Sequence, residues 1–283
     1  MSILSILSAV AYGHVGNSAA VFPLQRLGHE VWPVYTVNFS NHTGYGQWRG
    51  PVMAASDVAE VIQGVEERGA FEEVKAVLSG YQGSQDIGEV IIDTVARVKA
   101  ANPSAIYACD PVMGNAKSGC FVHPAIPVLL RDRVVPHADL ITPNQFELGY
   151  LTDTSPHTLE ETLESVDAAR AMGPSTILVT SVQRPDAAPH TLEMVAARGE
   201  EAWLVQTPHL PMKANGSGDV TAALFTAHLL ETNDLQVSLE RTVSSVYDLL
   251  QLTLDSGRRE LQLIAAQEWF AHPRLQFSAE KVR

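Results

Sequence analysis

The feature that most constrains the fold is a regular alternation of short apolar runs with longer stretches of helical periodicity. Helical spacing is clearest at 84–101, where Ile87, Ile91, Val95 and Val98 share one face. A strand-then-helix rhythm predicts a mostly parallel central sheet with helices on both faces, a three-layer α/β/α fold. Strands are predicted at 2–10, 29–39, within 71–81, at 105–114, at the start of 138–151 and at 175–182. Helices are predicted at 17–28, 57–69, 84–101, the end of 138–151, 158–173, 218–232 and 235–256.

The rhythm changes after Pro185. Two strand-like runs, 191–199 and 201–208, are joined at Gly199 and Glu200, which predicts a β-hairpin. No repeat, low-complexity tract or linker interrupts the chain, so we expect residues 1–283 to form one domain.

Some helix boundaries can also be predicted from single residues. Gly28 and Gly69 are expected to stop their helices, and Asp57 is expected to be the N-cap of the second helix.

Charge excludes several classes of partner. The formal net charge of −13 argues against nucleic acid and anionic lipid, although backbone N–H groups can still bind a phosphate. The apolar start has no basic residue before Arg26 and no run is long enough to span a membrane, so we expect no signal peptide and no membrane partner. Cys109 and Cys120 form no zinc-binding motif, and such low cysteine use is typical of a cytoplasmic protein.

In an open parallel sheet, ligands bind beyond the carboxyl ends of the strands. Polar residues follow several predicted strands here. The loop 38–48 mixes glycines with aromatic residues and suits either a flat ring ligand or an ordinary surface loop around Trp48. Asp110 precedes a proline, so it could hold Mg²⁺ or simply form a turn. Tyr81 could line a pocket, although its position alone favours simple packing.

Two further motifs have structural alternatives. Asn144 and Glu147 lie three apart at a predicted helix start, where an N-terminal cap is favoured over a ligand role about two to one by the spacing alone. The run 114–119 fails the spacing of a Walker A loop, which leaves Lys117 as a candidate mobile phosphate contact.

The strongest motif is Gly216-Ser217-Gly218-Asp219 directly before a helix. Free N–H groups at a helix N-terminus form an anion hole, and a carboxylate beside them could take a proton from a substrate hydroxyl. This pairing suits phosphoryl transfer. A glycine-rich turn capped by Asp219 would occupy the same position.

These motifs together resemble those of the ribokinase-like superfamily, and more closely the pyridoxal kinase family. The resemblance covers the whole chain and rests on "VAYGHVGNSAAVFPLQRLG", "FSNHTGYGQW", "LSGYQGS", "CDPVMG", "TPNQFEL", "LVTS" and "GSGDVTAALF". It implies a ribokinase-like α/β/α fold and ATP-dependent phosphorylation of the 5′-hydroxyl of pyridoxal, with pyridoxamine and pyridoxine as further substrates. It also implies Mg²⁺, a homodimer and a cytoplasmic location, and leaves open a monovalent cation.

The resemblance assigns roles to individual residues. Asp219 would be the general base and Gly216, Ser217 and Gly218 the anion hole. The vitamer would contact Ser8, Val10, Tyr12, Thr43, Gly44, Tyr81 and Asp219. The nucleotide would contact Asp110, Thr142, Asn144, Glu147, Thr180, Thr207, Pro208, His209 and Leu210, with Asp110 and Glu147 serving Mg²⁺.

Three positions depart from the family pattern: Leu7, Thr180 and Ser217. The first bears on ring binding and the second on the nucleotide. Two rival functions stay open. One is a hydroxymethylpyrimidine kinase on the same fold, and the other is a protein that binds B6 vitamers with little turnover.

Overall fold

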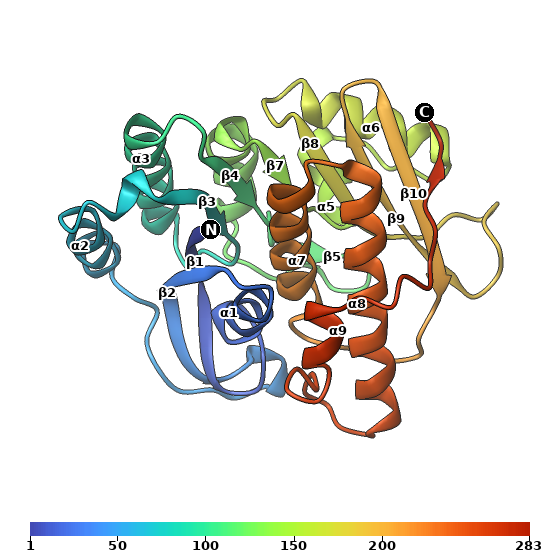
Figure 1. The fold of residues 1–283 in the computed structure, drawn as a ribbon, viewed down its shortest axis with the longest axis horizontal. Helices are drawn as coiled ribbons and strands as arrows, with labels where there is room; N and C mark the ends of the chain where they lie inside the picture. Colours follow the sequence, from blue (N-terminus) through green and yellow to red (C-terminus); the bar gives the residue numbers. More distant parts are fainter.

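The computed structural model describes all residues from 1 to 283 and contains one nine-stranded sheet (Figure 1). The strand order is β11-β10-β9-β8-β7-β4-β3-β1-β2. The strands are β1 (Ser2–Tyr12), β2 (Glu30–Asn41), β3 (Val74–Ser79), β4 (Ile106–Cys109), β7 (Leu140–Ile141), β8 (Thr176–Val182), β9 (Thr191–Arg198), β10 (Glu201–Pro208) and β11 (Glu280–Lys281).

Strand pairing confirms the predicted sheet. All neighbours from β2 through β1, β3, β4 and β7 to β8 are parallel. β9 and β10 form the predicted hairpin, and β11 adds antiparallel to its outer strand. The buried parallel strands read as continuous apolar runs because both of their faces are covered by helices.

Helices cover both faces of the sheet, as predicted (Figure 1). One core cluster packs α2, α3, α4, α5 and α6 on one face, and two others pack α1, α7, α8 and α9 on the opposite face. The helices are α1 (Asn17–Arg26), α2 (Ala55–Glu66), α3 (Gln85–Ala101), α4 (Ala125–Leu129), α5 (Gln145–Thr152), α6 (Leu159–Arg170), α7 (Ser217–Thr232), α8 (Leu235–Asp255) and α9 (Gln267–Ala271).

Helix ends follow local sequence with one exception. Gly28 has a left-handed φ of 85° directly after the C-cap of α1, as expected of a helix-stopping glycine. Gly69 is also left-handed, three residues beyond the end of α2. The prediction for Asp57 was wrong: α2 begins two residues earlier with Ala54 as its N-cap, and Asp57 lies in the first turn. An acidic side chain there still favours the positive end of the helix dipole.

Several short elements were not predicted from the sequence. They include α4 with the turns that follow it (Leu130–Val134 and Val135–His137), the 3₁₀ turns Thr43–Tyr45 and Ala70–Glu72, the hairpin of β5 (Gly114–Asn115) with β6 (Gly119–Cys120), α9 and β11. Segments of two to five residues are too short for periodicity to reveal.

The topology fixes where a ligand can bind. The chain runs from β1 to β2 on one side and then returns to β3 on the other side of β1. Strand order therefore reverses between β1 and β3, and a ligand is expected beyond their carboxyl ends. None of the helices has the length and apolar character needed to span a bilayer.

Candidate active site

The Gly216–Asp219 motif lies at the N-terminus of α7, as predicted. Gly216 is the N-cap with a left-handed φ of 86°, and the first helical hydrogen bond runs from Val220 N–H to the Gly216 carbonyl at 3.0 Å. The N–H groups of Ser217, Gly218 and Asp219 precede that bond, so they have no partner in the helix ladder. They form an anion-binding end of a helix that runs through the core.

Two glycines bring this motif against the end of β1. A Cβ at Gly216 would stand 1.9 Å from the His14 carbonyl oxygen, and one at Gly16 would stand 2.1 Å from the carbonyl oxygen of Ser8. Both residues also have positive φ. Only glycine allows these approaches, and they place Ser8 and the N-terminus of α7 on either side of one turn.

Three carboxyl groups converge below this turn. Burial raises the pKa of Asp219 to about 6, opposed by the backbone N–H groups of Gly16 and of Asp219 itself. Burial also raises the pKa of Asp110 well above its ordinary value, with the charges of Glu147 and Asp219 adding to the rise. Burial raises the pKa of Glu147 to about 7. Asp110 and Glu147 are only 6% and 4% exposed, and neither forms an ion pair with a basic side chain. The cluster is therefore short of positive charge.

Asn144 and Glu147 form a capping box at the start of α5, the arrangement that their spacing favoured. The Asn144 side chain accepts from Glu147 N–H, and Glu147 Oε2 accepts from Asn144 N–H at 2.9 Å. Glu147 Oε1 accepts from Met113 and Gly114 N–H groups at 2.9 and 3.2 Å. Glu147 thus fastens the segment after Asp110 to the start of α5.

No group of three or more His, Cys, Asp or Glu side chains is arranged as a protein-only metal site. Mg²⁺ bound with a nucleotide needs only one or two carboxylates, since phosphates and water supply its other ligands. The buried, unpaired carboxylate of Asp110 fits such a site, and Glu147 lies beside it with both oxygens already accepting from the backbone.

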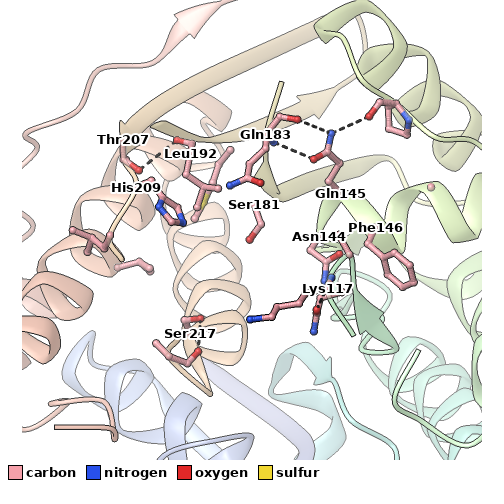
Figure 2. Close-up of a pocket in the computed structure, with 18 of the residues that line it drawn as sticks. Lys117, Asn144, Gln145, Phe146, Ser181, Gln183, Leu192, Thr207, His209 and Ser217 are labelled. Atoms are coloured by element: carbon pink, nitrogen blue, oxygen red, sulfur yellow. Dashed lines mark hydrogen bonds between the residues drawn. The ribbon is translucent and has the colours of Figure 1, made fainter. Parts of the chain in front are cut away.

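A cleft of about 840 Å³ opens beside α7 on the side of β8, β9 and β10 (Figure 2). Six residues of the predicted site line it: Asn144, Thr207, Pro208, His209, Leu210 and Ser217. Thr142 and Thr180 do not line this cleft. Thr142 is buried, and Thr180 N–H donates to the Pro143 carbonyl at 2.9 Å, which pairs the end of β8 with the turn before α5.

Residues that sequence reasoning missed also line the cleft. Ser181 has a left-handed φ of 55° within a bulge where β8 departs from β9, and Gln183 follows it. A serine is held in this conformation only when its surroundings require it. No sequence pattern distinguishes it from an ordinary strand residue.

Lys117 is the only Lys or Arg that lines the cleft. Figure 2 shows its side chain reaching into the cavity on the side where Ser217 begins α7. Its position supports the role of phosphate contact that the sequence suggested, because an ammonium group there faces the anion-binding end of the helix.

The residues expected around the ring lie in β1 or close after the ends of β1, β2 and β3. Ser8 lies at a register shift where β1 separates from β2, and Val10 packs in a small cluster against Tyr81. Thr43 and Gly44 form an exposed 3₁₀ turn after β2. Tyr12 differs from the others, because it is 63% exposed and packs edge-on against Tyr45.

Known proteins are similar to this chain over its whole length. The family model described as phosphomethylpyrimidine kinase matches residues 52–263. The chain is 71% identical over 282 residues to a protein named pyridoxal kinase PdxY from Leifsonia xyli subsp. xyli, covering 100% of both. A protein of the same name from Corynebacterium diphtheriae is 63% identical with the same coverage.

A similar fold is found among solved structures. The pyridoxal kinase of Leishmania donovani, solved in complex with ADP and pyridoxamine, is 26% identical and superposes with a TM-score of 0.93. The match covers 100% of this chain and 99% of the other. The three-layer architecture predicted from the sequence is therefore confirmed.

Proposed function

The chain belongs to the pyridoxal kinase family, and from that premise we propose that it transfers the γ-phosphoryl group of ATP to the 5′-hydroxyl of pyridoxal. ATP is the phosphoryl donor. The observation that carries the proposal is Asp219, a carboxylate of raised pKa placed on the anion-binding end of α7 and beside Ser8 at the end of β1. Residues 1–283 would act as one kinase domain.

Each group at the α7 terminus has a defined task in this proposal. Asp219 accepts the proton of the attacking 5′-hydroxyl, which makes the oxygen a better nucleophile. The N–H groups of residues 216–218, the anion hole expected from the sequence, donate to the oxygens of the moving phosphoryl group and stabilise its charge. Because such transfer depends on positioning and charge stabilisation, no covalent intermediate with the protein is required.

Asp110 would hold Mg²⁺, and Glu147 would support it through Asp110 and bridging water. The ion would neutralise the phosphate charge of ATP when bound. Glu147 keeps the segment after Asp110 in place through its bonds to Met113 and Gly114 N–H groups. A requirement for a monovalent cation remains a prediction.

The two substrates would lie on opposite sides of the α7 terminus. Asn144, Thr207–Leu210 and Ser217 line the cleft of about 840 Å³ that suits the nucleotide, and Lys117 would contact its phosphates. Thr142 and Thr180 would support this side from behind. The vitamer would lie over Val10 and Tyr81, with Ser8 at its polar edge and Thr43 and Gly44 above it.

A substrate panel tests the function directly. We expect ADP release that depends on Mg-ATP and on a B6 vitamer, and less release with hydroxymethylpyrimidine. Asp219→Asn should lower kcat by about 10²–10⁴-fold with little change in the KM for ATP. Preference for hydroxymethylpyrimidine would favour the rival function, a hydroxymethylpyrimidine kinase on the same fold. Binding of vitamer without ADP release would indicate a binding protein.

Assembly and location are predictions from the family. We expect a homodimer, which sedimentation equilibrium would measure, and a cytoplasmic protein. Both cysteines are free, one buried and one exposed, and neither is needed for the proposed chemistry.

A further inference from the structure

Three segments far apart in the sequence meet beyond the ends of β1 and β2. They are the turn after β1 at Gly13 and His14, the 3₁₀ turn Thr43–Tyr45, and the segment after α8 at Arg259 and Glu260. The last two are separated by 215 residues. The third segment contains no residue with a role assigned so far.

Arg259 contacts the 3₁₀ turn in two ways. Its Nη2 donates to the Gly44 carbonyl at 2.7 Å, and its guanidinium stacks over the Tyr45 ring at 3.6 Å from the centroid. A cation over an aromatic face adds electrostatic attraction to the hydrogen bond. Gly44 therefore has its carbonyl fixed by a residue near the C-terminus.

Glu260 joins the 3₁₀ turn to the end of β1. Its Oε1 accepts from the Tyr45 hydroxyl at 2.6 Å, and its Oε2 accepts from His14 N–H at 3.2 Å. The bond to Glu260 raises the pKa of Tyr45 to about 12, so the hydroxyl stays protonated and donating at neutral pH. A Cβ at Gly13 would stand 2.1 Å from Glu260 Oε2, and only glycine leaves room for the carboxylate.

We propose that Arg259 and Glu260 are positioning residues that hold the Thr43–Tyr45 turn over the vitamer pocket and so set the affinity for the vitamer. The inference rests on the proposed function, which places Thr43 and Gly44 at the ring. Neither residue touches the nucleotide cleft, so the binding of Mg-ATP is independent of them.

The neighbouring Arg258 provides a matched control. It is exposed on the same segment, and its side chain makes no hydrogen bond or ion pair. Arg258→Ala removes the same charge as Arg259→Ala without releasing the turn. Glu260→Gln keeps the size of the side chain but removes its charge. Its amide can keep the bond from His14 N–H only by turning its N–H₂ group to the Tyr45 hydroxyl, which must then accept instead of donate, so the charge-assisted bond between Tyr45 and Glu260 is lost.

The first measurement needs no activity. Arg49 is exposed in the loop after the 3₁₀ turn, and trypsin cleaves after it when the loop opens locally. We expect cleavage after Arg49, followed by fragment mass, to be at least about fivefold faster in Arg259→Ala and Glu260→Gln than in wild type or Arg258→Ala. Equal rates in all four proteins would overturn the proposal.

The second measurement is steady-state kinetics. Arg259→Ala and Glu260→Gln should raise the KM for pyridoxal about tenfold, with the KM for Mg-ATP unchanged and kcat changed less. Faster cleavage with an unchanged KM for pyridoxal would also overturn the proposal, because the turn would then not serve the vitamer. If wild type itself turns over no vitamer, the proposed function fails. In that case, the rate of cleavage after Arg49 and the directly measured Kd for pyridoxal test whether Arg259 and Glu260 position the turn.

Discussion

Asp219 shows how one residue acquires a role through its surroundings. An aspartate in water has a pKa near 4 and is a weak base. Here burial raises its pKa to about 6, so it is still ionised at neutral pH but accepts a proton more readily. The neighbouring N–H groups of Gly16 and Asp219 limit the rise and keep the charged form available.

This pKa predicts a pH profile. The proposed base works only when deprotonated, so kcat/KM for pyridoxal should be constant above the pKa and fall as pH drops through about 6. The residual activity of Asp219→Asn should lack this limb. A wild-type limb that lies near the ordinary aspartate value, or that persists in the variant, would contradict the assignment.

At the scale of elements, the turn between β10 and α7 matters more than either element alone. Gly216 combines a positive φ with a close approach to the His14 carbonyl, whereas Gly218 is open: its nearest contact for an added Cβ is Asp110 Oδ2 at 3.9 Å. A side chain therefore has room at Gly218 but not at Gly216.

Alanine substitution should affect the two glycines differently. Gly216→Ala should destabilise the protein by about 1–3 kcal/mol and abolish most activity, because the new Cβ pushes the turn after β1 away from α7. Gly218→Ala should have a melting temperature within about two degrees of that of the wild type. Thermal unfolding of both variants makes the comparison. Equal melting temperatures would show that the approach to His14 does not constrain the turn.

At the scale of the whole molecule, the carboxyl cluster links folding to its ligands. Glu147 has a folded pKa of about 7 against an ordinary value near 4.5, and the pKa of Asp110 is raised as well. The folded state then holds these protons more tightly than the unfolded chain does. Their contribution to the unfolding free energy is therefore highest at low pH and decreases as pH rises from about 4.5 through about 7.

Bound Mg²⁺ should offset this loss. We expect the melting temperature without ligand to fall between about pH 5 and pH 7, and Mg-ATP to raise it most at the upper end. Glu147→Gln, measured alongside, should show a shallower dependence on pH. A melting temperature that rises over this range, or that responds equally to Mg-ATP at every pH, would refute the linkage.

Much of the fold could be predicted because local patterns were strong. Ile87, Ile91, Val95 and Val98 mark α3, and Gly199 with Glu200 after β9 marks the hairpin. The Gly216–Asp219 motif predicted its own helix end. The prediction that Asp57 caps α2 was wrong. The helix begins at Ala55, so Asp57 lies within its first turn, where an acidic residue is also favoured and gives the same sequence signal.

The sequence by itself determined the order of elements, the parallel sheet and the chemistry at the ends of the strands, since each depends on periodicity or on neighbouring residues. Only the tertiary structure decided which of these residues meet. It placed Ser181 in a left-handed bulge, brought the Met113 and Gly114 N–H groups to Glu147 Oε1, and brought Arg259 and Glu260 to a turn 215 residues away. Such contacts arise from packing between distant segments, which no local pattern encodes.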